Sequence, residues 1–102
     1  GAADQENSLS ASVPNPFVEE TSIYFFLSDE RSVRLFVLNA EGREVLTLRS
    51  GVLPKGSHAA SWDGRDSSGR RVPPGVYLYR LEAGSWSAER RMTLADSPHG
   101  SP

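Results

Sequence analysis

Apolar and polar residues alternate along most of the chain, in short segments separated by residues that favour turns. The alternating segments are residues 9–13, 21–28, 32–38, 43–49 and 57–62, followed by two arms on either side of Gly84-Ser85. A period of two indicates strands with one buried face, and no segment keeps the 3.6-residue period of a helix. Because turn signals recur roughly every ten residues, the pattern predicts an all-β antiparallel sandwich of about seven strands, Ig-like or fibronectin-III-like.

The last two strands are the part of the chain whose pairing is best determined. Gly84-Ser85 fits a two-residue hairpin loop of type II′ or type I′. With that loop, Tyr77 lies opposite Met92 on one face, and Arg80 meets the opposite charge of Glu89 on the other. A shift of one residue would mix apolar and charged positions on both faces, so we expect this register.

The segment 43–49 allows two alternations. Either Val45 or the pair Leu46 and Leu48 can face inward, and a β-bulge would resolve the conflict.

Near the N-terminus, Leu9, Ala11 and Val13 alternate with serines, which predicts a half-buried first strand with these side chains on one face. Pro14 and Pro16 then end its ladder, because proline lacks an amide donor and holds the residue before it in an extended conformation. We therefore expect both prolines to be structural.

The connection around residues 63–75 also carries residues that we expect to be structural. Trp62 and Tyr77 are assigned to the core, and Gly64 and Gly75 to its turns. Tyr77 is expected to act like a tyrosine corner, with its hydroxyl bonded to the backbone where Pro73-Pro74-Gly75 leads into the next strand.

The composition narrows the classes of function. With 102 residues and no cysteine, the chain is expected to form one domain without disulfides or a thiolate metal site. A formal net charge of −2 argues against nucleic acid as a partner, because nucleic-acid binding normally needs a basic surface. No apolar run approaches the roughly 20 residues that cross a bilayer, so membrane insertion is not expected.

The ends of the chain predict a module taken from a longer protein. No charged and apolar leader opens the chain, and Gly1-Ala2 is typical of a cloning remnant. The expected organisation is a flexible segment over residues 1–8, a sandwich over 9–94 and a flexible tail over 95–102. We expect the isolated module to be monomeric, although exposed edge strands always allow pairing.

A series of short motifs, in order, resembles one family. They are Pro14-Asn15-Pro16-Phe17, Gly42-Arg43-Glu44-Val45, Gly56 through Trp62-Asp63-Gly64, Gly75-Val76-Tyr77 and Arg91-Met92. Over residues 13–94 the chain resembles the Ig-like domain of the flagellar hook-capping protein. It is equally similar to the C-terminal domains appended to many secreted bacterial proteins, including the type A sorting domains of the type IX secretion pathway.

The resemblance implies a seven-stranded Ig-like sandwich without enzymatic activity or cofactor. For the appended domains it implies an address that the secretion machinery recognises, after which the cargo is fixed at the cell surface. For the hook-capping relatives it implies a scaffold for flagellar assembly. One departure is that sorting domains generally stop after the last strand, whereas residues 95–102 continue beyond Leu94.

The candidates for metal binding and catalysis are few. Asp63 and Asp66 could begin a calcium loop, but calcium takes six to eight oxygens and only two carboxylates lie in this stretch. We expect them to bond nearby backbone amides as turn residues, with no metal. His58 and His99 are the only histidines, and neither has a second ligand or a nucleophile at useful spacing.

Exposed aromatic residues would be the mark of a sugar-binding sandwich. The candidates lie opposite the assigned core face or near a hairpin tip, and they are Tyr24, Phe26, Phe36 and Trp86. Such a patch indicates contact of some kind, so a carbohydrate-binding or spacer accessory module stays an alternative.

The last strand holds the candidates for protein docking. Arg90 and Arg91 form a basic strip there, and terminal strands are a natural place for edge pairing. We expect the stem of Arg90 to pack on Tyr79 while its guanidinium reaches water. The favoured hypothesis is a non-catalytic C-terminal module of a larger secreted or surface bacterial protein, which docks on a protein partner; a flagellar hook-assembly scaffold is a further alternative.

Overall fold

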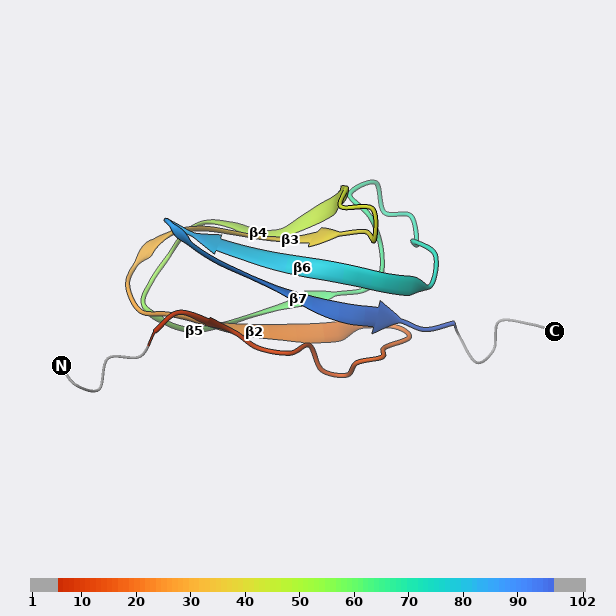
Figure 1. Cartoon of the computed structure of the whole chain (residues 1–102), viewed down its shortest axis with the longest axis horizontal. Coiled ribbons are helices and arrows are strands. Elements are labelled where there is room, and N and C mark those ends of the chain that lie inside the picture. Colours follow the sequence, from red (N-terminus) through yellow and green to blue (C-terminus); the bar gives the residue numbers. More distant parts are fainter. Residues whose placement is uncertain (1–5, 97–102) are drawn as a thin grey trace.

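The computed structural model describes residues 6–96, and those residues form two antiparallel sheets packed face to face (Figure 1). The strands are β1 (Ser8–Leu9), β2 (Thr21–Leu27), β3 (Arg31–Leu38), β4 (Glu44–Leu53), β5 (Gly56–Trp62), β6 (Gly75–Ala83) and β7 (Trp86–Leu94). One sheet has the order β1-β2-β5 and the other β4-β3-β6-β7. The seven-stranded all-β sandwich is thereby confirmed.

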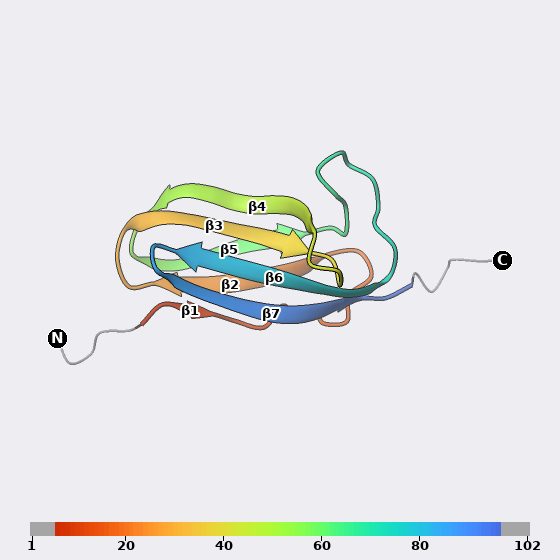
Figure 2. The same cartoon turned by 45° about the horizontal axis from the view of Figure 1, so that its top comes forward.

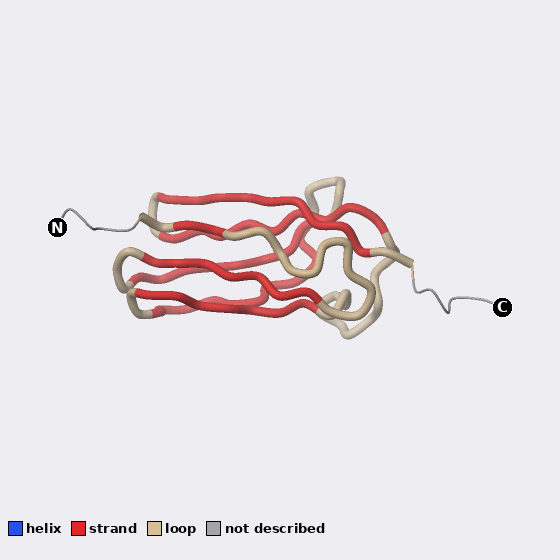
Figure 3. The backbone as a smooth tube through the Cα atoms, turned by 90° about the horizontal axis from the view of Figure 1, so that it is seen from below, coloured by secondary structure: helices blue, strands red, loops and turns tan. Residues whose placement is uncertain are grey.

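The position of β4 defines the type of sandwich. It pairs with β3 in the larger sheet and leaves β5 at the edge of the smaller one. An immunoglobulin constant domain places its fourth strand in the other sheet, so the present arrangement is the fibronectin-III-like variant. The long strands run side by side and the loops gather at the two ends (Figure 3). The 63–74 connection projects from the body of the sandwich at one of these ends (Figure 2).

The predicted register of the last hairpin is confirmed. Tyr77 pairs with Met92 and Arg80 with Glu89, and the hairpin closes at Ala83 and Trp86. Gly84 has a φ of +65° while Ser85 keeps a negative φ. This combination selects the type II′ loop from the two that the sequence allowed.

Two irregularities in β4 resolve its ambiguous pattern. The β3–β4 register shifts between Leu35 and Phe36 and again between Val37 and Leu38. As a result Val45, Leu46 and Leu48 all pack partly buried against the core. The expected bulge is therefore present, in two places, and it lets both sets of apolar residues contribute.

The prediction for the first strand is wrong beyond Leu9. Leu9 is buried opposite Phe25, but Ala11 is exposed, Ser12 is buried and Val13 is 60% exposed. The ladder with β2 is interrupted after Ser10 and resumes at a single bridge, where Val13 pairs with Ser22. Alternation assumes a continuous strand, and the interruption moves Val13 to the outer face.

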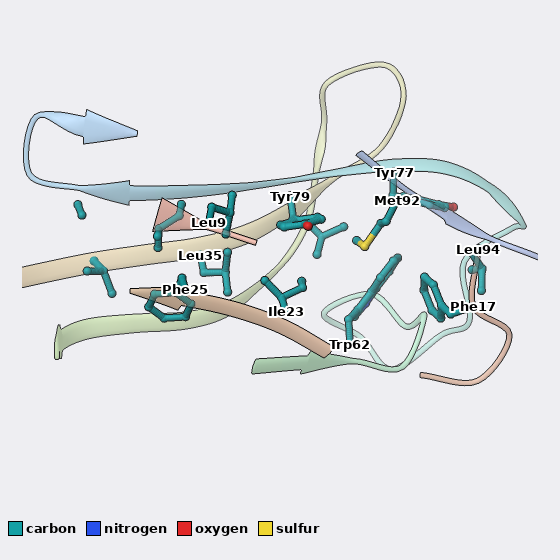
Figure 4. Close-up of a cluster of buried hydrophobic side chains, with 14 of the residues drawn as sticks. Leu9, Phe17, Ile23, Phe25, Leu35, Trp62, Tyr77, Tyr79, Met92 and Leu94 are labelled. Atoms are coloured by element: carbon teal, nitrogen blue, oxygen red, sulfur yellow. The ribbon is translucent and has the colours of Figure 1, made fainter. Parts of the chain in front are cut away.

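Aromatic rings fill the end of the core near the 63–74 connection (Figure 4). Trp62 lies between Phe17 and Tyr77, with ring centroids 5.6 Å and 5.2 Å away in edge-to-face geometry. The Trp62 indole donates to the carbonyl of Arg65 at 2.8 Å, and the Tyr77 hydroxyl donates to that of Pro73 at 2.6 Å. The second bond is the tyrosine-corner contact expected from the sequence, and together the two fix both ends of the connection.

Candidate functional site

The loop after β5 is closed by its own hydrogen bonds and does not form a metal cage. Asp66 Oδ1 accepts three hydrogen bonds. Two come from Ser68, from its amide at 2.9 Å and from its hydroxyl at 2.7 Å, and the third comes from the amide of Arg70 at 3.0 Å. The hydroxyl of Ser68 and these amides hold the pKa of Asp66 below its usual value. Asp63 instead lies 3.7 Å from the guanidinium of Arg65. Within residues 6–96 no three His, Cys, Asp or Glu side chains gather as a metal site would need.

His58 has a structural environment. Its ring stacks on Phe25 with centroids 5.3 Å apart, and its Nε2 lies 2.8 Å from the carbonyl oxygen of Pro54. Neither neighbour is a nucleophile or an acid. His99 lies outside the described residues. Residues 6–96 form no helix, so no helix in this part of the chain could cross a membrane.

The outward face of the larger sheet is covered by ion pairs. Arg34 pairs with Glu44. Arg80 pairs with two carboxylates: its Nη1 lies 3.9 Å from Oε2 of Glu82, and its Nε lies 3.4 Å from Oε1 of Glu89. The Arg34 hydrogen bond lowers the pKa of Glu44 below its ordinary value.

Phe36 lies beneath this charged layer. The guanidinium carbon of Arg34 sits 4.0 Å above its ring centroid, and Phe36 is only 5% exposed. Its outward position suggested an exposed stacking residue, but the arginine covers it, so Phe36 is removed from the candidates.

The outward face of the smaller sheet carries the two remaining aromatic candidates of β2. Tyr24 is 49% exposed and Phe26 is half-buried, both on the side of β2 opposite its buried positions. Trp86 does not join them, because it occupies an inward position of β7 and packs partly buried against the core. The structure thus separates the three stacking candidates that remain after Phe36 into a pair on β2 and one hairpin residue.

β7 is an edge strand, and the outward backbone groups at one of its ends are already hydrogen-bonded to another segment. At its C-terminal end the segment before β2 pairs in parallel: the amide of Thr93 donates to Asn15 Oδ1 at 2.9 Å, and that of Phe17 to the carbonyl of Thr93 at 3.0 Å. The carbonyl of Phe17 in turn accepts from the amide of Ala95 at 2.8 Å. Thr93 therefore turns its backbone groups away from β6.

In an antiparallel pair the residues with outward backbone groups alternate. The other positions of this set in β7 are Ser87, Glu89 and Arg91, which we call the β7 edge. Their amides and carbonyls have no hydrogen-bond partner from another segment of residues 6–96. This edge is therefore the candidate docking site.

The two arginines predicted for docking have different environments. Arg90 points inward and its Nε donates to the carbonyl of Leu9 at 2.5 Å, which joins the edge strands of the two sheets. Arg90 is exposed, and the bond to Leu9 is an addition to the expected contact with water that the sequence could not indicate, since Leu9 is 81 residues away. Arg91 lies exposed on the outer face of the larger sheet and is part of the β7 edge.

The fold and its surfaces define an Ig-like β-sandwich. Residues 18–87 match the model of the FlgD Ig-like domain. The chain therefore belongs to the FlgD Ig-like domain family. No curated protein matches it.

Two solved structures resemble the chain at low identity. A crystal structure of dimeric latent PorU from Porphyromonas gingivalis matches over 93% of the chain, with 17% identity and a TM-score of 0.67. The chain spans about a tenth of that protein, since the match covers 10% of its length. The DNA-bound alkylpurine DNA glycosylase AlkC from Pseudomonas fluorescens matches over 87% of the chain and 30% of its own, with 14% identity and a TM-score of 0.49. The first likeness agrees with the fold, and the second is too weak to carry an argument.

Proposed function

We propose that the chain is a non-catalytic docking module of a larger secreted bacterial protein. Secretion or surface-attachment machinery recognises it when an extended segment of a partner protein pairs with the β7 edge. Three things support this function: membership of an Ig-like family, the likeness of the sequence to type IX sorting domains, and the fold likeness to a domain-sized part of PorU.

The half-occupied state of the β7 edge is the observation that carries the proposal. Asn15–Phe17 already pairs with the C-terminal end of β7, so this edge accommodates an extended segment beside it. The outward amides and carbonyls of Ser87, Glu89 and Arg91 continue the same row. A partner strand added there gains main-chain hydrogen bonds, which is a common mode of peptide recognition. The charge of Arg91 favours an acidic residue on that partner.

The test removes one outward amide without breaking the β6–β7 ladder. Proline is tolerated at an edge position whose amide faces solvent, so Glu89→Pro deletes a donor of the β7 edge and leaves the fold in place. Glu89→Ala is the matched control, because it removes the same carboxylate and keeps the amide. A reporter fused ahead of the chain is expressed in a bacterium with a type IX system, and its surface display is measured with antibody.

We expect Glu89→Pro to abolish display and Glu89→Ala to preserve it. The thermal unfolding of each purified variant shows whether it is folded. If Glu89→Pro does not fold, Ser87→Pro removes a different outward amide and gives the same test. A folded proline variant that is displayed like the parent chain would refute docking at the β7 edge.

The family match by itself favours a second candidate, a scaffold in flagellar hook assembly. Pull-down of hook subunits by the purified chain, together with absence of reporter display, would support this candidate. Display without hook-subunit binding would reject it.

A further inference from the structure

The outward face of the β1-β2-β5 sheet is built from uncharged residues. The register of the three strands places on it the hydroxyls and rings of Ser8, Ser10, Ser22, Tyr24, Phe26, Ser57 and Ser61, together with Ala59. Acidic and basic side chains make up 24% of the chain, and the outward face of the other sheet carries three ion pairs. We propose that the uncharged face, here called the hydroxyl face, binds an uncharged polysaccharide, with the ring of Tyr24 as its stacking platform.

The two aromatic rings lie in one row. Tyr24 and Phe26 are two residues apart on the same side of β2, so their Cα atoms are separated by about 6.6 Å along the strand. Tyr24 stands beside the small side chain of Ala59, and the residue is 49% exposed. Phe26 lies between Ser8 and Ser57 and is half-buried. The exposed ring of Tyr24 and the half-buried ring of Phe26 together form an apolar strip along β2.

Hydroxyls flank this strip on both sides. Ser57 and Ser61 of β5 lie on one side, and Ser8 and Ser10 on the other. A serine hydroxyl both donates and accepts hydrogen bonds, and so does each hydroxyl of a sugar. The faces of a sugar ring carry C–H groups that pack on an aromatic ring, while the hydroxyls around its rim meet the serines.

The absence of charge on the hydroxyl face decides between classes of ligand. The strand positions of this face carry no charged side chain, and the guanidinium of Arg49 at its β5 edge is already bonded to the carbonyl of Ala59. An acidic polysaccharide, a nucleic acid or a charged peptide would therefore have to desolvate its ions against a face with little counter-charge. An uncharged ligand has no such cost. The face is the outer side of a three-stranded sheet and not a pocket, so an extended β-linked glucan fits it better than a single sugar, which needs an enclosing pocket.

This site is separate from the β7 edge, which belongs to the other sheet. The test is electrophoresis of the whole chain in native gels that contain mixed-linkage β-glucan, polygalacturonate or no polymer. Tyr24→Thr removes the ring but keeps a hydroxyl, strand propensity and net charge. Tyr24→Phe removes only the hydroxyl. Val52→Thr is the matched control, because Val52 is a 65% exposed apolar residue on an edge strand of the other sheet.

We expect retardation by β-glucan and none by polygalacturonate. Tyr24→Thr should weaken the apparent affinity about tenfold or more, since aromatic anchors dominate contact energies, whereas Tyr24→Phe and Val52→Thr should retain it. Three results would overturn the proposal: no retardation of the parent chain, equal loss in Tyr24→Thr and Val52→Thr, or preference for the acidic polymer. Sedimentation that shows self-association abolished by Tyr24→Thr, without glucan binding, would assign the hydroxyl face to a second copy instead.

Discussion

The hydroxyl of Tyr79 offers a sharp test of how the two sheets are joined. Its ring is fully buried, and the hydroxyl donates to the carbonyl of Ser10 at 2.6 Å, across 69 residues of sequence. The substitution Tyr79→Phe deletes this bond and leaves the ring packing unchanged. Tyr77→Phe is the matched control, because its hydroxyl donates to Pro73 at the same distance, within the loop rather than between sheets.

The size of the effect follows from the bond alone. A neutral intramolecular hydrogen bond contributes about 1 kcal/mol net, and no cavity is created by removing one oxygen. The exposed position of Ser10 lets water replace part of the lost bond. We therefore expect the free energy of unfolding to fall by about 1 kcal/mol, which corresponds to roughly 4–8 °C in Tm for a domain of this size.

The pH dependence gives a second measurement of the same group. Burial raises the pKa of Tyr79 above its ordinary value of 10.0, so the folded state favours the protonated phenol. The contribution of the Tyr79 phenol to the free energy of unfolding is complete below pH 10 and is lost as the pH rises through the raised pKa. Tyr79→Phe should accordingly reduce the loss of stability above pH 10. Burial also raises the pKa of Tyr77, so part of that loss remains.

Urea unfolding and hydrogen exchange measure both consequences. Both substitutions should lower the unfolding free energy, but only Tyr79→Phe should speed exchange of the amide that Ser10 donates to Tyr24. No measurable change in stability, or equal protection of that amide in the two variants, would refute the role of Tyr79 in holding the N-terminal segment.

Three further substitutions test the core, the hairpin and the loop. Trp62→Ala should lower the unfolding free energy by about 3–5 kcal/mol in urea, because the ring is only 1% exposed; a cost near zero would contradict its core position. Gly84→Ala and Gly42→Ala should each cost about 1–2 kcal/mol by thermal unfolding, because both glycines have a positive φ and the Arg31 tip, 2.8 Å from the new Cβ at Gly84, is the end of a flexible side chain that moves aside; a cost near zero at either position would contradict the left-handed conformation there. Asp66→Ala should speed proteolysis of the 63–72 loop more than Asp66→Asn, which keeps a neutral oxygen acceptor, and the parent loop should loosen toward the Asp66→Asn level as the pH falls below about 3.8, since the pKa of Asp66 is lowered; equal resistance of the parent chain and both variants would contradict the role of its carboxylate.

The parts of the fold that could be predicted are those that local geometry determines. The two-residue loop at Gly84-Ser85 allows one register without mixing faces, so every pair of the last hairpin followed from it. Tyr77 reaches Pro73, four residues away, and this contact also lies within the range of a sequence pattern.

The parts that escaped prediction depend on contacts between distant residues. Val13 alternates correctly with Ala11, yet it faces outward because the ladder with β2 breaks after Ser10. Serine and alanine are compatible with either face, so alternation among them carries little information. The occupied half of the last strand was also hidden, since it needs Phe17 beside Thr93. The candidate sites thus depended on tertiary neighbours more than on residue type.

Two arginines explain why only part of the sandwich rim remains open to partners. On one side Arg90 Nε donates to the carbonyl of Leu9 at 2.5 Å, and on the other Arg49 Nη1 donates to that of Ala59 at 3.0 Å. Both extend from edge strands of the larger sheet to the edge strand opposite. Charged residues that point inward from an edge strand disfavour indiscriminate pairing with other chains. A partner that adds to the β7 edge must therefore satisfy the outward backbone groups without displacing Arg90, which gives this edge a means of selectivity that an apolar edge would lack.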